Sequence, residues 1–142
     1  FYFTPRSVML YKIITGNEVK RVAPESLAIL VASLRVLDAL RIRFVLTDGH
    51  AYHSMTQFSG SAAGLERIDW SNLQASNFKH GDDDPKRHER YQAEALVHRH
   101  LPVAAIERIV CYSSHQREHL VSLAERFKCE IPIESKPEWF FA

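Results

Sequence analysis

Glu94 is the residue whose type and position in the chain could do chemistry. It ends the triplet Gln92-Ala93-Glu94, and the apolar run 95–97 that follows predicts a strand entering the core. The preceding residues 77–90 contain no aliphatic side chain, so they predict an exposed loop. A carboxylate held where that loop meets a rigid strand could polarise a glycosidic bond, accept a ribose hydroxyl or take a proton from a nucleophile. The alternative is a solvated glutamate at the start of a strand.

A second group of polar and aromatic residues lies near the start of the sequence: Tyr2, Arg6, Ser7 and Tyr11. Aromatic faces can stack on a planar ring, and a guanidinium group can bind the phosphate or oxygen atoms of a ligand. The same residues are compatible with a structural role, in which the rings belong to the core and the arginine extends to solvent from an apolar stem.

The charged loop combines cations with aromatic rings, chiefly Lys86, Arg87, Arg90 and Tyr91. This combination suits single-stranded nucleic acid, because its bases stack and its phosphates need positive charge. Four acidic residues in the same loop argue against indiscriminate binding, and a solvated charged loop is the alternative. Strand alternation would also place Gln92 on the same face as Glu94.

A metal site is a further hypothesis that the residue types raise. His50 and His53 lie about one turn apart in a helix expected over residues 50–58, and imidazole is a common ligand of transition metals. Further ligands would have to come from Asp48, His80, His88 or the aspartates 82–84. None is convincingly spaced, and three adjacent carboxylates repel one another and point in different directions. We therefore expect no metal, and interpret Asp48 as a turn residue and His50 as a helix cap or a wall of the site.

The elements that must position these residues follow from the hydrophobic pattern, which predicts a single α+β domain. Strands are expected at 1–3, 27–32, 44–47, 95–97, 106–112 and 131–133, and helices at 8–14, 34–40, 50–58 and 114–127. The run 27–32 is continuously apolar, which is typical of a strand buried on both faces. Pro132 predicts an edge position for the last strand, and the aromatic tail 137–141 is expected to dock on the core.

Size and charge narrow the class of protein. A chain of 142 residues, 46% hydrophobic and 25% charged, suits one globular domain with a real core. A net charge of +1 excludes the overall basic character of a dedicated nucleic-acid binder. No apolar run approaches the ~20 residues that span a bilayer, and no secretion signal is evident. With two distant cysteines expected as buried thiols, we predict a cytoplasmic protein. Because the sequence opens on Phe1-Tyr2-Phe3 without methionine, we also expect an upstream segment.

Several blocks of the sequence, in this order and spacing, resemble the DarT family of DNA ADP-ribosyltransferase toxins. The blocks are residues 1–11 (FYFTPRSVMLY), 44–51 (FVLTDGHA), 68–70 (IDW), and 84–85 (DP) followed by 92–94 (QAE). The resemblance runs over nearly the whole chain, and the Thr-Asp-Gly-His-Ala and Gln-Ala-Glu blocks are its most specific parts. It implies an ADP-ribosyltransferase-like split central β-sheet with flanking helices, lacking an N-terminal part.

The resemblance also implies a function. Members transfer ADP-ribose from NAD, a co-substrate, to a base in single-stranded DNA, usually thymine, and release nicotinamide without a metal. They act as toxins paired with a macrodomain-type antitoxin. Glu94 matches the catalytic glutamate, and residues 77–91 match the flexible loop that holds the substrate. Tyr2, Ser7 and Tyr11 are similar to residues lining the nicotinamide pocket, and Arg6 is a candidate NAD contact. The candidate DNA contacts are Gln92, His50, Lys86, Arg87, Arg90 and Tyr91.

The sequence departs from the family at its start. The family's first segment, which supplies a histidine that holds the NAD ribose, has no counterpart, and Val8 stands where proline is expected. One alternative is therefore a catalytically dead, truncated relative that only binds single-stranded DNA or an antitoxin partner. Another is a metal-dependent nuclease that uses His50, His53 and the loop aspartates.

Overall fold

The structure of the protein is a computed structural model that describes residues 1–79 and 83–141. Its contacts divide the chain into two compact units. Unit 1 consists of Phe1–Val8 and Arg41–Leu101, and unit 2 consists of Met9–Leu40 and Pro102–Ala142. Each unit contains one three-stranded sheet. That the two units form a single domain over residues 1–142 remains a prediction.

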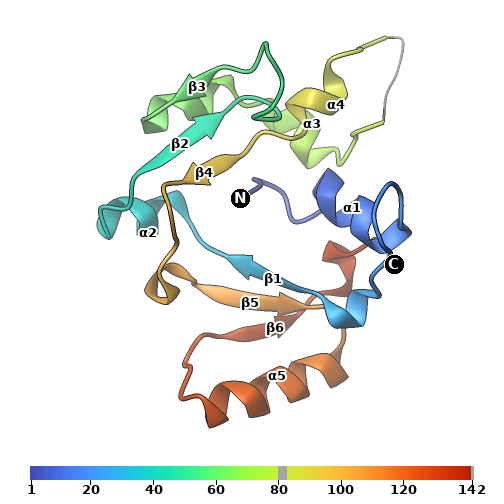
Figure 1. The fold of residues 1–142 in the computed structure, drawn as a ribbon, viewed down its shortest axis with the longest axis vertical. Coiled ribbons are helices and arrows are strands. Elements are labelled where there is room, and N and C mark those ends of the chain that lie inside the picture. Colours follow the sequence, from blue (N-terminus) through green and yellow to red (C-terminus); the bar gives the residue numbers. More distant parts are fainter. Residues whose placement is uncertain (80–82, 142) are drawn as a thin grey trace. The chain divides into compact units, whose positions relative to one another are not determined.

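The sheet of unit 1 is antiparallel and carries the Glu94 segment. Its strands are β2 (Phe44–Thr47), β3 (Phe58–Ser59) and β4 (Ala95–Val97), in the order β3-β2-β4 (Figure 1). Beyond β4, the Ala95 backbone N–H donates to the Phe1 carbonyl at 2.7 Å, and Tyr2 forms a β-bridge with Glu94. The strands expected at 44–47 and 95–97 are therefore confirmed, whereas the strand expected at 1–3 is reduced to an isolated bridge at Tyr2.

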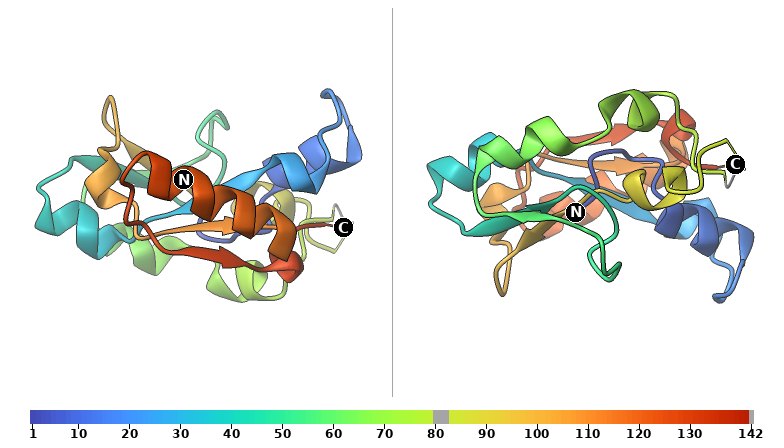
Figure 2. Two further views of the ribbon diagram at one scale, coloured as in Figure 1. Left: turned by 90° about the horizontal axis from the view of Figure 1, so that it is seen from below. Right: turned by 90° about the horizontal axis from the view of Figure 1, so that it is seen from above.

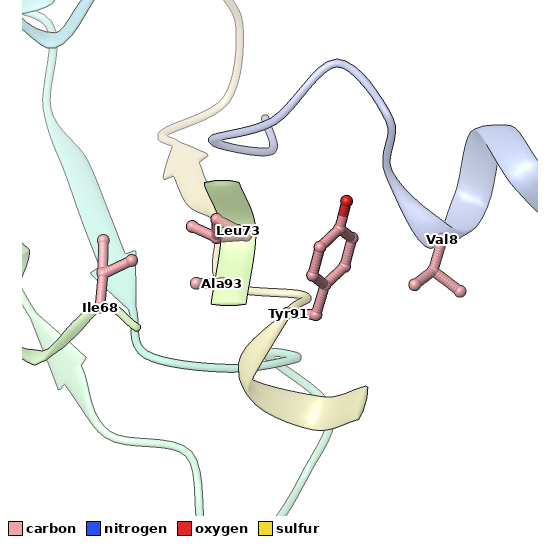
Figure 3. Close-up of a cluster of buried hydrophobic side chains, with 5 residues drawn as sticks. All are labelled: Val8, Ile68, Leu73, Tyr91 and Ala93. Carbon is pink, nitrogen blue, oxygen red and sulfur yellow. The ribbon is translucent and has the colours of Figure 1, made fainter. Parts of the chain in front are cut away.

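Short helices surround this sheet and build a small core. They are η2 (Ala62–Arg67), α3 (Trp70–Gln74) and α4 (Arg87–Arg90). Asp69 caps α3, because its Oδ1 accepts from the Asn72 N–H at 3.1 Å. The buried cluster contains Val8, Ile68, Leu73, Tyr91 and Ala93, and the Tyr91 ring lies between Val8 and the pair Leu73 and Ala93 (Figure 3).

Unit 2 is built around the sheet β1-β5-β6. Strand β1 (Ala28–Val31) runs antiparallel to β5 (Arg108–Cys111), and β6 (Ile133–Ser135) runs parallel to β5 at the sheet edge. Helix α5 (Ser114–Arg126) lies along one face of β5 and β6 (Figures 1 and 2). The other elements are α2 (Leu34–Ala39), η1 (Pro24–Ser26), η3 (Val103–Ala105) and η4 (Pro137–Trp139), and α1 (Val8–Thr15) begins at the last residue of unit 1.

Local sequence rules account for the ends of the unit 2 helices. The Ser33 and Ser113 side chains cap α2 and α5 by accepting backbone N–H groups three residues on. Gly16 ends α1 with a φ of 77°, and its N–H donates to the Lys12 carbonyl. Phe140 is 2% exposed in the core cluster, so the expected docking of the aromatic tail is confirmed.

The expected burial of the strand 27–32 on both faces is wrong. Exposure alternates along β1, and Leu30 is 51% exposed while Ile29 packs against the core of unit 2. An apolar run shows that a strand is favoured but not how many of its faces are covered.

The helix expected over residues 50–58 is also wrong. The chain forms turns and then β3, and Met55 and Phe58 are exposed instead of facing inward. The polar side chains compete for the backbone: the His50 Nδ1 accepts from the Tyr52 N–H, the His53 Nδ1 accepts from the Met55 N–H, and the Thr56 hydroxyl donates to the His50 carbonyl.

Two further expectations concern the environment of the chain. Over the described residues, no helix has the length and apolar character needed to cross a membrane. Both cysteines are free thiols, with Cys111 buried and Cys129 partly exposed.

Candidate active site

Glu94 is fixed to the sheet on both sides of its backbone. On one side it bridges Tyr2, and on the other its carbonyl accepts from the Thr47 N–H at 2.9 Å. The Glu94 N–H donates to the Thr47 hydroxyl at 3.1 Å. One carboxylate oxygen, Oε1, accepts from the Ala51 N–H at 3.1 Å. A partly buried carboxylate with a defined direction results. Because a carboxylate offers about four acceptor positions, one N–H leaves capacity for a substrate.

The turn after β2 is shaped to bring Ala51 to that carboxylate. The Thr47 hydroxyl donates to the Gly49 carbonyl at 2.7 Å, and the His50 N–H donates to the Glu89 carbonyl at 3.1 Å. A Cβ at Gly49 would lie 3.1 Å from the Glu89 carbonyl oxygen, so the absence of a side chain permits this close approach. The Thr-Asp-Gly-His-Ala and Gln-Ala-Glu blocks thus belong to one structural site.

Tyr2 contributes a protonated phenol to the surroundings of Glu94. Partners in a β-bridge project their side chains to the same face of a sheet. Burial raises the pKa of the Tyr2 phenol, and the negative charge of Glu94 raises it further. At neutral pH the group is therefore a hydrogen-bond donor beside an acceptor.

The other candidate NAD contacts are divided between the two units. Arg6 and Ser7 belong to unit 1, where the Arg6 carbonyl accepts from the Tyr91 hydroxyl at 2.9 Å and Ser7 is buried. Tyr11 belongs to unit 2, on α1, and its ring packs edge-on against Phe141 with the centroids 5.3 Å apart. Within unit 1, the structure brings Tyr2 to Glu94.

Two of the candidate DNA cations, Arg87 and Arg90, form ion pairs with aspartates. Arg90 makes a bidentate pair with Asp84, at 3.1 and 2.5 Å, and its Nε donates to Asp69 at 2.9 Å. Arg87 pairs with Asp83 and lies 3.7 Å from Asp84. The hydrogen bond from Arg90 lowers the pKa of Asp84. Burial acts to raise the pKa of Asp69, but hydrogen bonds led by that from Arg90 outweigh it and lower the pKa. Lys86, by contrast, is exposed.

Tyr91 and Gln92 do not have the placement expected for DNA contacts. The Tyr91 side chain is 1% exposed, so its ring offers no face to a stacked base in this structure (Figure 3). Gln92 lies in the turn after α4, where its Nε2 donates to the His88 carbonyl at 3.2 Å. Strand pairing begins only at Glu94, so the alternation argument for Gln92 fails.

The loop 77–91 is partly structured, since it contains α4. His80, Gly81 and Asp82 lie outside the described residues. Elsewhere in the chain, within the described ranges, no group of three or more His, Cys, Asp or Glu side chains could hold a metal ion. His50 and His53 each have Nδ1 bonded to a backbone N–H, so the nuclease alternative gains no support from them.

Sequence reasoning missed Thr47, Gly49 and Ala51 as parts of this site. Ala51 acts through its backbone amide, for which side-chain type gives no signal. Thr47 reads as an ordinary β-branched strand residue. The signal that points to them is the Thr-Asp-Gly-His-Ala block, one of the most specific parts of the family resemblance.

Comparison with known proteins identifies the family of the chain. The family model for "ssDNA thymidine ADP-ribosyltransferase, DarT" matches residues 1–141. The chain belongs to the DarT family. A DNA ADP-ribosyl transferase of Escherichia coli O127:H6 (strain E2348/69 / EPEC) is 40% identical over 143 residues, covering 100% of the chain and 66% of that relative.

Solved structures of a DarT protein agree in fold. Thermus sp. 2.9 DarT in complex with NAD+ is similar with a TM-score of 0.88, and its complex with ADP-ribosylated ssDNA with 0.89. Both are 32% identical and match 99% of the chain, covering 71% and 67% of the solved chains, respectively. The predicted ADP-ribosyltransferase-like α+β fold is therefore confirmed. The chain spans 66% and 59% of the lengths of the first two curated DNA ADP-ribosyl transferases that it matches.

Proposed function

We propose that this DarT-family chain transfers ADP-ribose from NAD to a thymine base of single-stranded DNA and releases nicotinamide. The observation that carries the proposal is the Glu94 carboxylate, anchored at the start of β4 and directed by the Ala51 amide. Its support comes from relatives named DNA ADP-ribosyl transferases and from Thermus sp. 2.9 DarT, solved in complex with NAD+ and in complex with ADP-ribosylated ssDNA.

Glu94 has two proposed roles in this reaction. As the bond between nicotinamide and ribose C1′ breaks, positive charge develops on the ribose, and a fixed carboxylate stabilises that charge. Nicotinamide leaves with the bonding electron pair. The thymine ring nitrogen then bonds to C1′, and Glu94 accepts the proton that the ring nitrogen loses. A carboxylate already fixed in direction needs little reorganisation during the reaction.

The residues near the start of the chain are proposed as NAD contacts. Tyr2 supplies an aromatic face and a protonated phenol beside Glu94. The phenol could donate a hydrogen bond to the amide group on the nicotinamide ring or to a ribose hydroxyl. Arg6, Ser7 and Tyr11 are proposed to complete the NAD site, as the family resemblance implies.

The segment 77–91 is proposed to hold the DNA. Lys86 is exposed and suits a phosphate contact, and His50 lies one residue from the Ala51 amide that binds Glu94. Arg87 and Arg90 would have to exchange aspartate partners for phosphate, which predicts weak, salt-sensitive contacts. Gln92 remains a proposed contact, whereas we assign Tyr91 a structural role in the core.

The biological setting of the chain is likewise proposed. We assign it the role of a cytoplasmic toxin whose modification of DNA is countered by a macrodomain-type antitoxin. The support is family membership.

Mass spectrometry of oligonucleotides tests the reaction. The purified protein with NAD should add one ADP-ribose to a thymine-containing single-stranded oligonucleotide, and a matched oligonucleotide without thymine should stay unmodified. Calorimetric titration with NAD and with DNA distinguishes an active transferase from the alternative of a catalytically dead relative that only binds DNA. A protein that binds the oligonucleotide but neither binds nor consumes NAD would be the non-catalytic binder, and the proposal of transferase activity would fail.

A further inference from the structure

We infer that Thr47 is a positioning residue that directs the Glu94 carboxylate through a hydroxyl-centred link between β4 and the turn 47–51. The catalytic consequence rests on the proposed function. The structural link itself does not rest on the proposed function, because it consists of hydrogen bonds between residues of unit 1.

The Thr47 hydroxyl is buried and both donates and accepts a hydrogen bond. Thr47 is 1% exposed. Oγ1 donates to the Gly49 carbonyl at 2.7 Å and accepts from the Glu94 N–H at 3.1 Å. A hydroxyl has one proton and two lone pairs, so both bonds form at once. The contact from Oγ1 to the Glu94 carbonyl is longer, at 3.3 Å, so the proton belongs to the Gly49 bond.

This hydroxyl replaces a missing backbone acceptor. Strands β2 and β4 pair antiparallel from Phe44 to Leu46, and the next pair along would be Thr47 with Glu94. The Thr47 N–H does donate to the Glu94 carbonyl at 2.9 Å. The returning bond from Glu94 goes to the Thr47 side chain, because the chain turns at Asp48-Gly49. Both backbone groups of Glu94 therefore depend on Thr47.

The same hydroxyl also sets the turn that binds the carboxylate. By holding the Gly49 carbonyl, it fixes the backbone two residues before Ala51, whose N–H donates to Glu94 Oε1. The backbone of Glu94 and the group that orients its carboxylate are thus connected through a single oxygen atom. Removing that atom should loosen both together.

Two substitutions separate the hydroxyl from the shape of the side chain. Thr47→Val keeps the branched shape and removes the hydroxyl, whereas Thr47→Ser keeps the hydroxyl and removes the methyl group. Thr47→Cys serves as a third variant of similar size whose thiol is a weak donor, should the valine protein not fold.

Amide hydrogen exchange of Ala51, measured by NMR, reports the link without any enzymatic assay. We expect Thr47→Val to exchange this amide about tenfold faster or more, because the turn loses its anchor, and Thr47→Ser to stay within about threefold of wild type. In the transfer assay, Thr47→Val should lower kcat by roughly 10²-fold with KM for NAD nearly unchanged, and serine should restore most of kcat.

The pattern across the variants decides the inference. If a folded valine variant keeps wild-type Ala51 exchange and kcat, or if serine and valine lose both equally, Thr47 does not act through its hydroxyl. If valine does not fold, cysteine must show the loss and serine must not. A wild-type protein without transferase activity would overturn the proposed function, while the exchange comparison would still test the Thr47 link.

Discussion

At the scale of single residues, the proposed chemistry centres on Glu94 and its immediate neighbours in unit 1. Thr47 bonds its backbone, Ala51 binds its carboxylate, and Tyr2 lies on its other side as a bridge partner. The central feature is a partly buried anion whose carboxylate is directed by the Ala51 amide and whose backbone is held by the Thr47 hydroxyl, and no described residue forms a salt bridge with it. Such an anion remains able to respond to positive charge on a substrate.

The raised pKa of Tyr2 predicts how the stability of the protein depends on pH. Its pKa is raised in the folded protein, so the unfolded chain loses the phenolic proton first as pH rises above about 10. The contribution of Tyr2 to stability is therefore complete below that pH and is lost as pH rises through the folded-state value. Urea unfolding between pH 9 and 11 should show stability falling less steeply for Tyr2→Phe than for wild type. Identical slopes for the two proteins would contradict the raised pKa that burial, and secondarily Glu94, gives the Tyr2 phenol.

At the scale of elements, the turn 47–51 and the segment before β4 hold each other. Gly49 lies against the Glu89 carbonyl, and His50 donates to the same oxygen. The interaction is local and tightly packed, so it has little tolerance for added volume.

Gly49→Ala tests that packing. The added Cβ would meet the Glu89 carbonyl at 3.1 Å, and overpacking of this kind costs about 1–3 kcal/mol. Gly60→Ala is the matched control, because a Cβ there has no neighbour within 4 Å and should change stability by less than about 0.5 kcal/mol. Chemical denaturation measures both. Equal changes in stability for the two substitutions would show that the turn moves to accommodate the added Cβ, and would contradict tight packing at Gly49.

Elements were predicted from sequence where the hydrophobic pattern is regular. The helices expected at 34–40 and 114–127 are present as α2 and α5, and the structure shows that Ser33 and Ser113 cap them. The helix predicted for the segment 50–58 is absent. Its apolar residues have helical spacing, but the side chains of His50, His53 and Thr56 form hydrogen bonds with the backbone that favour turns instead.

The site itself was predictable only in part. Glu94 could be singled out as a candidate because a charged loop precedes an apolar strand. The burial of Tyr91 could not be predicted, because an aromatic residue beside cations has the same sequence pattern whether its ring is exposed or, as here, buried. The partners of Arg87 and Arg90 depend on the fold of the loop, which the pattern of charges does not determine.

At the scale of the whole molecule, the chain contains two compact units with separate cores. Unit 1 carries Glu94 and Tyr2, and unit 2 carries Tyr11 on α1. The sequence predicts that they form one domain over 1–142, and a single domain should unfold cooperatively.

The two tryptophans report on one unit each. Trp70 lies in unit 1 and Trp139 in unit 2, and the chain has no other tryptophan. Variants Trp139→Phe and Trp70→Phe therefore leave one fluorescent probe per unit. Their urea transitions should coincide in midpoint and slope once corrected for the stability of each variant. Two separate transitions in a protein that retains both tryptophans would contradict the single-domain prediction.

The central claim, that the Glu94 carboxylate performs the transfer of ADP-ribose, is tested most directly by Glu94→Gln. Glutamine keeps the size of the side chain and an oxygen able to accept from the Ala51 amide, but it removes the negative charge. Under saturating NAD and thymine-containing single-stranded DNA, we predict that kcat falls by about 10³-fold or more, while binding of both substrates persists. A folded Glu94→Gln protein that modifies the DNA at the wild-type rate would contradict the account.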